Sequence, residues 1–167
     1  MIEILPEQID GNLFSAINDD WMLITALKND GRISTMTASW GGFGIMWNKP
    51  VCLCAIRPQR YTNEFVKEND RLTLTFLKDG HRDALKLCGT KSGRDCDKIA
   101  LASLTPITDN GIAYFEQSRL VVVARKIYVS SFKAECFVDK AILDKNYPKN
   151  DLHDVYVCEI ERVLVSR

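Results

Sequence analysis

The residues with the clearest chemical potential lie between Gly31 and Thr62. Three small hydroxyl side chains, Thr35, Thr37 and Ser39, occupy alternating positions, so in a strand they would share one face. Two glycines after the following Trp40 would let the backbone turn sharply and approach a ligand closely. Hydroxyl and backbone N–H groups beside an aromatic ring suit a flat heterocycle that needs hydrogen bonds along one edge.

A second polar group follows in the segment Arg57-Pro58-Gln59-Arg60-Tyr61-Thr62. Two guanidinium groups three residues apart, next to an expected helix start, would attract the same anion, and a phosphate fits them best. The alternative interpretation is that these arginines are ordinary surface charges and that the hydroxyls form a solvated strand face. We favour one pocket, with a ring at the first segment and a phosphate at the second.

The composition excludes several classes of function. Lys and Arg total 22, as do Asp and Glu, so the net charge is zero and the basic footprint of a nucleic-acid-binding protein is missing. The longest uncharged run, residues 33–47, is too short and too rich in Ser, Thr and Gly to span a membrane. Glu3, Pro6 and Glu7 interrupt any apolar signal segment, so we expect a cytoplasmic protein of one domain.

Six cysteines and two histidines have spacings that favour neither disulfides nor metal binding, because no Cys-x-x-Cys occurs. Cys52 and Cys54 stand two apart in an apolar run, so we expect them to share a strand face as buried, reduced thiols. His81 and His153 are expected to be structural or exposed. We therefore predict no metal site and no nucleophilic triad.

Apolar and alternating stretches predict six strands, over residues 21–27, 32–40, 50–56, 71–77, 117–132 and 152–165. Asp30-Gly31 predicts a hairpin turn between the first two. The fifth stretch is long enough that we expect a bend or bulge in it. The strands do not alternate regularly with helices, which favours a mainly β, antiparallel barrel over a doubly wound sheet.

Short helices are predicted over residues 6–17, 61–67, 81–87 and 95–102. Thr62 is the expected N-cap of the second helix. Residues 41–47, which include three glycines, and residues 137–149 are expected to be loops, the second with room for a helical turn.

Four blocks of the chain, in this order, closely resemble the flavin reductase-like, FMN-binding split-barrel family: residues 31–42 (GRISTMTASWGG), 47–62 (WNKP followed by RPQRYT), 88–99 (CGTKSGRDCDKI) and 147–160 (YP, LHDVY and EI). The resemblance implies that residues 1–167 form a single FMN-binding domain, a six-stranded Greek-key split β-barrel with inserted short helices. It also implies a homodimer with FMN near the subunit interface. Because the flavin carries the chemistry, no catalytic side chain is expected.

The resemblance also implies which residues contact the cofactor. Those expected at the isoalloxazine ring and ribityl chain, largely through backbone groups, are Thr35, Met36, Thr37, Ala38, Ser39 and Trp40. Those expected at the phosphate end are Arg57, Gln59, Arg60, Tyr61 and Thr62, with Ser92, Gly93 and Lys98 closing the pocket from the side. The chain departs from the family at Ser34, where many relatives carry Asn two residues before the Met.

Three functions are compatible with this resemblance. The first is an NAD(P)H:flavin oxidoreductase, whose partners are the small molecules flavin and nicotinamide. The second is a flavoredoxin-like carrier that exchanges electrons with a redox protein partner without turning over NAD(P)H, and the third is a flavin sensor. NADH and NADPH are not distinguished, because the chain has no Gly-x-Gly-x-x-Gly segment to interpret.

Overall fold

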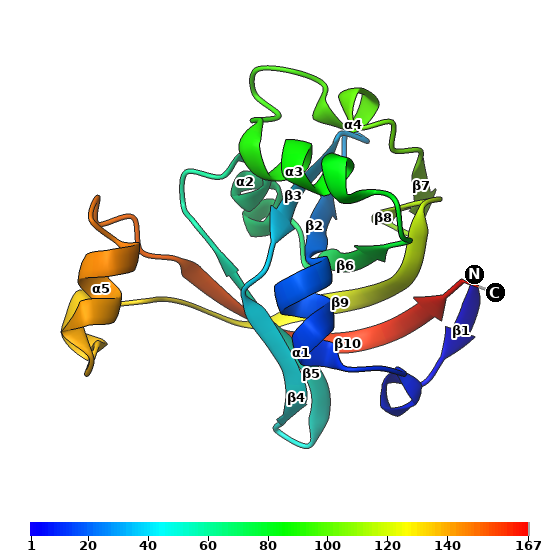
Figure 1. The fold of residues 1–167 in the computed structure, drawn as a ribbon. Helices are drawn as coiled ribbons and strands as arrows, with labels where there is room; N and C mark the ends of the chain where they lie inside the picture. Colours follow the sequence, from blue (N-terminus) through cyan, green and yellow to red (C-terminus); the bar gives the residue numbers. More distant parts are fainter. Residues whose placement is uncertain (167) are drawn as a thin grey trace.

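Eight strands form one antiparallel sheet in the computed structural model, which describes residues 1–166 (Figure 1). Their order is β3-β2-β6-β9-β10-β5-β4, with β1 paired to β10, and β7 and β8 form a separate hairpin. The path ends at β3 and β4, so the sheet is not closed. The strands are β1 Ile2–Ile4, β2 Met22–Leu27, β3 Ile33–Ala38, β4 Gly41–Met46, β5 Lys49–Ile56, β6 Arg71–Leu77, β7 Pro106–Asp109, β8 Ile112–Phe115, β9 Ser118–Ser131 and β10 Asp154–Val165.

The six predicted strands are all present, as β2, β3, β5, β6, β9 and β10. The total of six is wrong, because β1, β4, β7 and β8 are strands as well. The expected bulge is confirmed, since the register of β9 against β10 shifts twice, between Val157 and Cys158 and between Ile160 and Arg162. Cys52 and Cys54 are buried together in the core, as predicted, with Cys158 directly opposite Cys52 on β10.

The predicted loop over residues 41–47 is instead strand β4, paired with β5 along its whole length. The chain reverses at Trp47 and Asn48, whose φ angles of 52° and 56° match a two-residue turn with both central residues left-handed. Such a turn fixes the register of the hairpin. Glycines that suggest a loop in the sequence are therefore strand residues here.

The helices are η1 Pro6–Gln8, α1 Leu13–Ser15, η2 Ala16–Asp20, α2 Tyr61–Glu68, α3 Arg82–Thr90, α4 Lys98–Leu101, η3 Ala134–Cys136 and α5 Lys140–Asn146. The helix predicted over residues 6–17 is broken, because Gly11 has a φ of 96° and separates η1 from α1. Thr62 is not an N-cap. Arg60 holds that position, and the Thr62 hydroxyl bonds the Ser34 hydroxyl at 2.9 Å instead.

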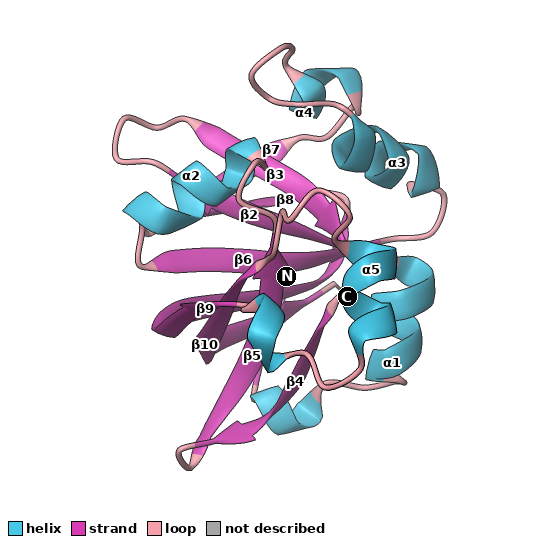
Figure 2. Cartoon of the chain, turned by 90° about the vertical axis from the view of Figure 1, so that its left-hand side faces the viewer, coloured by secondary structure: helices cyan, strands magenta, loops and turns pink. Residues whose placement is uncertain are grey.

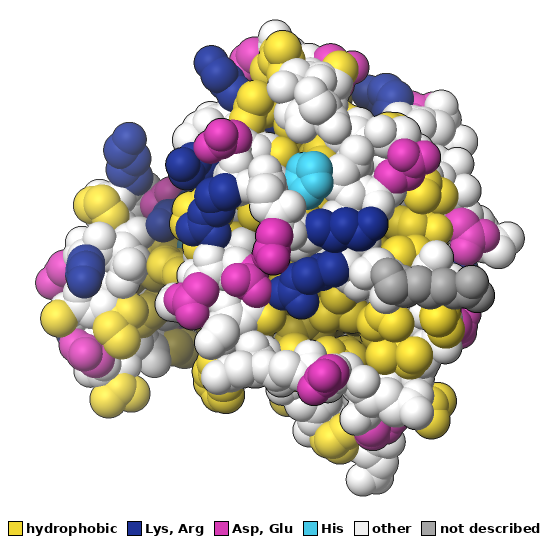
Figure 3. Space-filling model, turned by 45° about the vertical axis from the view of Figure 1, so that its right-hand side comes forward, with side chains coloured by type: hydrophobic (Ala, Val, Ile, Leu, Met, Phe, Trp, Pro, Cys, Tyr) yellow, Lys and Arg dark blue, Asp and Glu magenta, His cyan; other side chains and the backbone are white. Residues whose placement is uncertain are grey.

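The helices lie on different parts of the sheet (Figures 1 and 2). Helices α2, α3 and α4 gather at the end where β2 and β3 lie, and α5 projects from the connection between β9 and β10. Lys, Arg, Asp and Glu side chains are interspersed over the face shown in Figure 3, in keeping with the zero net charge. The crowded end with α2 and α3 is where the predicted site residues lie.

A buried polar network fixes the start of α2 against β10. Tyr156 Oη donates to Asn63 Oδ1 at 2.6 Å, and Asn63 Nδ2 donates to Asp154 Oδ2 at 2.8 Å. Lys67 on the same helix pairs with Asp154 at 2.8 Å. The buried polar side-chain atoms of this network all have partners, so it holds the start of α2 in a defined place.

Gly41 provides a test of the unexpected strand. A Cβ atom at this position would lie 2.4 Å from the Leu53 carbonyl oxygen, whereas a Cβ at Gly42 would meet nothing within 4 Å. We expect Gly41→Ala to lower the free energy of unfolding by about 1–3 kcal/mol, because the φ of 154° and the paired backbone leave no room. Gly42→Ala is the matched control, with a change within about 0.5 kcal/mol. Urea denaturation measures both, and equal losses would contradict the close pairing of β4 with β5.

Candidate flavin-binding cleft

Two adjoining cavities meet where the end of β3 faces the segment between β5 and α2. The first, of about 230 Å³, is lined by residues 36–40 together with Ala55, Arg57, Arg60 and His153. The second, of about 290 Å³, is lined by Met36, Arg57, Gln59, Arg60, Tyr61, Thr62, Thr90, Lys91, Ser92, Gly93, Lys98 and Asp151. Met36, Arg57 and Arg60 line both, so the two segments singled out in the sequence share one cleft. We call these the ring cavity and the phosphate cavity.

The hydroxyl row on β3 is largely used by the protein itself. The Thr35 hydroxyl lies 2.8 Å from the Thr25 hydroxyl in the core, and the Thr37 hydroxyl donates to the Leu85 carbonyl of α3 at 2.5 Å. Thr35 lines neither the ring cavity nor the phosphate cavity. Of the hydroxyls predicted to face the ring, Thr37 and Ser39 line the ring cavity. The Thr35 and Thr37 hydroxyls are therefore occupied, and the predicted ligand contacts of this strand would fall mainly to its backbone groups.

Two cations of the phosphate cavity cap the same helix. Arg60 Nη1 donates to the Gly89 carbonyl at 2.7 Å, and Lys98 Nζ donates to the carbonyls of Cys88 and Lys91 at 3.1 and 3.3 Å. These carbonyls belong to the C-terminal end of α3, the negative end of its dipole, where cations bind well. The end of α3 thus fixes both charged groups in the wall of the cavity.

Neither cation has a carboxylate partner within residues 1–166. Lys98 is only 5% exposed, and burial lowers its pKa. Burial, together with the nearby Arg57 charge, also lowers the pKa of Arg60. Each positive charge is therefore under-compensated, and an anion in the cavity would stabilise both.

Arg57 and Gln59 have partners already. Arg57 Nη1 lies 2.6 Å from the Asp151 carboxylate, and Arg57 Nη2 donates to the Asn146 carbonyl at 2.9 Å. Gln59 Nε2 donates to the same carboxylate at 2.7 Å. These contacts tie the segment before α2 to the end of α5, so both side chains position the cleft wall as well as lining it.

Ser92 and Gly93 close the phosphate cavity from the side. The Ser92 hydroxyl accepts from the Arg94 backbone N–H at 3.2 Å. A Cβ on Gly93 would lie 3.0 Å from the Tyr61 ring, so a larger residue there would displace Tyr61. The absence of a side chain lets this loop approach the start of α2, which brings Lys98 and Arg60 to one cavity.

His153 is a cleft residue that the sequence reasoning set aside. It is 7% exposed, its ring centroid lies 5.1 Å from that of Trp40, and its Nδ1 lies 2.8 Å from Tyr147 Oη. Burial and the Arg57 charge lower its pKa to about 4. The imidazole is therefore neutral near pH 7. In the sequence, His153 lies in the last block that resembles the family, residues 147–160, but the resemblance implied no role for it.

Comparison with known proteins places this cleft in context. The family model described as the flavin reductase like domain matches residues 14–167. The chain belongs to this family. No curated protein matches the sequence significantly.

Solved structures of other flavin reductase-like proteins share the fold. An FMN-binding protein from Thermus thermophilus, with bound p-hydroxybenzaldehyde, superposes with a TM-score of 0.70 at 17% identity, over 100% of this chain and 83% of that one. A flavoredoxin from Methanosarcina acetivorans gives 0.70 at 18% identity, covering 96% and 76%. A flavoredoxin from Desulfovibrio vulgaris (Miyazaki F) gives 0.69 at 19%, covering 88% and 69%.

Among the helices of residues 1–166, none is long and apolar enough to cross a membrane. The cleft of this flavin reductase-like domain brings together most residues of the predicted site: residues 36–40 in the ring cavity, and Gln59, Tyr61, Thr62, Ser92, Gly93 and Lys98 in the phosphate cavity, with Arg57 and Arg60 between them. Their contact with a flavin stays a prediction.

The lowered pKa of His153 predicts a pH-dependent stability. The unfolded chain binds a proton at this imidazole below about pH 6.5, while the folded protein resists it until about pH 4. Stability contributed by the neutral imidazole is therefore complete above pH 6.5 and is lost as the pH falls, by about 2 kcal/mol between pH 7 and pH 5. Urea denaturation of the wild type and His153→Gln at both pH values measures this loss. A loss of the same size in the variant would show that other groups cause it.

Proposed function

We propose that this chain binds FMN in the cleft and acts as an oxidoreductase that takes electrons from NAD(P)H. The observation that carries the proposal is the pair of under-compensated cations, Arg60 and Lys98, held by the end of α3 beside a cavity lined by the family's signature segments. Family membership supports a flavin ligand, and the fold is that of FMN-binding proteins. Neither observation bears on the electron donor.

The residues present fit a phosphorylated flavin. Besides Arg57, Arg60 and Lys98, the phosphate cavity is lined by Lys91, so four cations face one carboxylate, that of Asp151. The ring cavity adjoins it through Met36, which suits a ligand with a ring at one end and a phosphate at the other. Charge-assisted hydrogen bonds from such groups contribute about 1.5–3 kcal/mol each.

When bound, FMN supplies the redox chemistry, because no protein side chain in the cleft accepts a hydride. The chain's own groups bind and orient. Arg60 and Lys98 neutralise the phosphate, while the backbone of residues 37–39 and the Thr37 and Ser39 positions line the ring cavity. Trp40, which is 44% exposed, lines this cavity beside His153, and we propose that a second molecule approaches the flavin on this exposed side.

We also propose that two copies of the chain associate as a dimer. Several large apolar side chains are exposed around the β4–β5 turn and the second half of β9, including Ile45 at 70%, Trp47 at 58% and Tyr128 at 50%. The rings of Trp47 and Tyr128 lie with centroids 6.3 Å apart, so they form one patch. Apolar patches of this kind are typical of protein–protein interfaces.

A visible spectrum of the purified protein, followed by anaerobic addition of NADH or NADPH, tests the electron donor. The enzyme predicts a bound flavin band that bleaches with either nucleotide within the time of a turnover. A band that only dithionite bleaches would reject NAD(P)H turnover and leave a flavoredoxin-like carrier or a sensor. A colourless protein that takes up no flavin on soaking would reject the proposal altogether.

Comparing FMN with riboflavin, which lacks the phosphate, isolates the phosphate site. Arg60→Ala and Lys98→Met should each weaken FMN binding by about tenfold to a hundredfold, at roughly 1.5–3 kcal/mol per charged contact, and leave riboflavin affinity unchanged. Arg57→Ala is the comparison within the cleft, with a smaller loss because Asp151 already compensates its charge. Titration calorimetry gives all these affinities. Equal losses for FMN and riboflavin would mean that the cations only shape the fold.

A further inference from the structure

Residues 132–152 form an arm that connects β9 to β10 and projects from the body of the protein (Figure 1). Its helix α5 buries none of its own residues. At the base of the arm, Tyr147 is buried and contacts His153. In the described part of the chain, every other side-chain hydrogen bond or ion pair between the arm and the rest of the protein involves Arg57 or Gln59. The arm is therefore fastened to the cleft mainly through these two side chains.

Among the described residues, the Arg57 guanidinium forms its hydrogen bonds and its ion pair only with the arm. It donates to the carbonyls of Asn146 and Asp151 at 2.9 and 3.3 Å and lies 5.1 Å from the centroid of the Tyr147 ring. It also pairs with Asp151 Oδ2 at 2.6 Å, and Gln59 Nε2 donates to the same oxygen at 2.7 Å. The hydrogen bonds from Gln59 and Arg57 hold the pKa of Asp151 below its ordinary value, so this carboxylate is charged near pH 7.

Asp151 is also part of the phosphate cavity, and no other carboxylate is among the described residues that line it. Carboxylate and phosphate oxygens are both anionic acceptors, so they bind the same guanidinium and amide donors. A phosphate that accepted from Arg57 and Gln59 would have to replace Asp151 Oδ2, because two anionic oxygens at one set of donors repel each other. For two of the residues predicted to bind phosphate, Asp151 therefore occupies the position of a phosphate oxygen.

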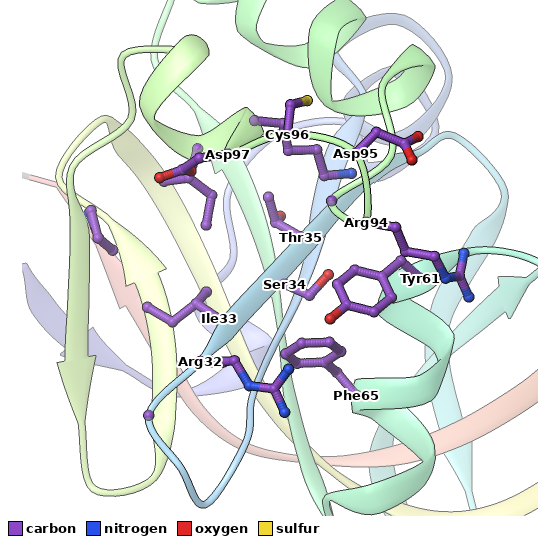
Figure 4. Close-up of a pocket in the computed structure, with 15 residues that line it drawn as sticks. Arg32, Ile33, Ser34, Thr35, Tyr61, Phe65, Arg94, Asp95, Cys96 and Asp97 are labelled. Carbon is purple, nitrogen blue, oxygen red and sulfur yellow. The ribbon is translucent and has the colours of Figure 1, made fainter.

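The neighbouring cavity contains no such competition. That cavity, of about 540 Å³, shares Lys98 with the phosphate cavity (Figure 4). Its arginines are paired with carboxylates that do not line the phosphate cavity, Arg32 with Asp30 at 2.7 Å and Arg94 with Glu64. A phosphate bound at Lys98 would leave both ion pairs in place, so the competition is confined to the arm.

We propose that Asp151 is an internal competitor of the flavin phosphate, and that phosphate binding detaches the arm from the cleft. This inference rests on the proposed FMN site. A phosphate that accepts from Arg57 and Gln59 breaks their contacts with the Asp151 carboxylate, so the free energy of these contacts is subtracted from that of FMN binding. The coupling is reciprocal, because whatever holds the arm away from Arg57 raises FMN affinity by the factor by which FMN loosens the arm. The arm thus controls loading and release of the flavin.

Asp151→Asn tests the competition, because the amide keeps the shape of the side chain and removes its charge. We expect this variant to bind FMN about tenfold tighter than the wild type, which is a typical coupling between two sites, and to bind riboflavin with unchanged affinity. Titration calorimetry measures both affinities, and thermal melting verifies that the variant is folded.

Asp144→Asn is the matched control. Asp144 is an exposed residue of α5 that lines neither the ring cavity nor the phosphate cavity. Its replacement removes the same charge from the same arm and should leave both affinities unchanged.

Hydrogen exchange of the wild type, followed by mass spectrometry, tests the release of the arm without any variant. Exchange of the backbone N–H groups in residues 140–150 should become about tenfold faster with saturating FMN, by the same coupling factor, and should not change with riboflavin. Bound ligands ordinarily slow exchange around their site, so a faster rate confined to the arm is specific to this coupling.

Three results would overturn the coupling in a protein that binds FMN more tightly than riboflavin. The first is an Asp151→Asn variant whose FMN affinity is no higher than that of the wild type, and the second is an equal gain in Asp144→Asn. The third is an arm whose exchange FMN slows or leaves unchanged. A protein that binds neither flavin, or that binds FMN no tighter than riboflavin, would instead reject the proposed phosphate site and the coupling with it, so the two failures are distinguishable.

Discussion

The site depends on the C-terminal end of α3, where two positive side chains from other parts of the chain bind the last carbonyl groups. Arg60 comes from the segment before α2 and Lys98 from the start of α4, and both meet α3 within four residues of each other. Burying an ammonium group such as that of Lys98 costs several kcal/mol unless it is hydrogen-bonded and its charge is compensated. The carbonyls supply the hydrogen bonds, but only part of the compensation. An anion bound beside Arg60 and Lys98 would complete the compensation.

Other features of the fold serve to keep these two cations where they are. The buried network through Asn63, Asp154 and Tyr156 fixes the start of α2, and with it Arg60. The Thr37 hydroxyl bonds α3 and so anchors the helix on β3. Gly93 permits the close contact with Tyr61 that brings Lys98 near Arg60. The charge of Arg57, in contrast, is neutralised by Asp151, so proximity in sequence to Arg60 does not make the two arginines equivalent.

The strands could be predicted from the sequence where a local pattern of apolar residues determines the structure. Alternating or continuous apolar residues predict β2, β3, β5, β6, β9 and β10, because burial on one or both faces of a strand leaves a recognisable pattern in the sequence. The sequence does not predict β4, because its glycines give no alternating apolar pattern. Residues 41–46 form a strand because they pair with β5. The prediction of one helix over residues 6–17 was wrong for a related reason. It relied on the four-residue spacing of apolar side chains, whereas the left-handed backbone of Gly11 divides the segment into two helices.

For the site, the segments could be predicted from the sequence, but the roles of their side chains could not. Alternation correctly placed Thr35 and Thr37 on one face, but it could not show that this face packs against Thr25 and α3. Nor could it show that His153 reaches the cleft, because that contact joins the end of β10 to residues near Trp40, far away in the chain. Such long-range contacts depend on strand order, which a single sequence does not reveal.

The distribution of charge along the cleft favours a ligand of unequal ends. The phosphate cavity has four cations against one carboxylate. A ligand with its negative charge concentrated at one end matches this distribution. The neutral imidazole of His153 adds no positive charge at the ring cavity near pH 7. Electrostatic attraction would therefore centre on Lys98 and Arg60 and hold the anionic end of the proposed ligand, while the shape of the ring cavity would select its other end.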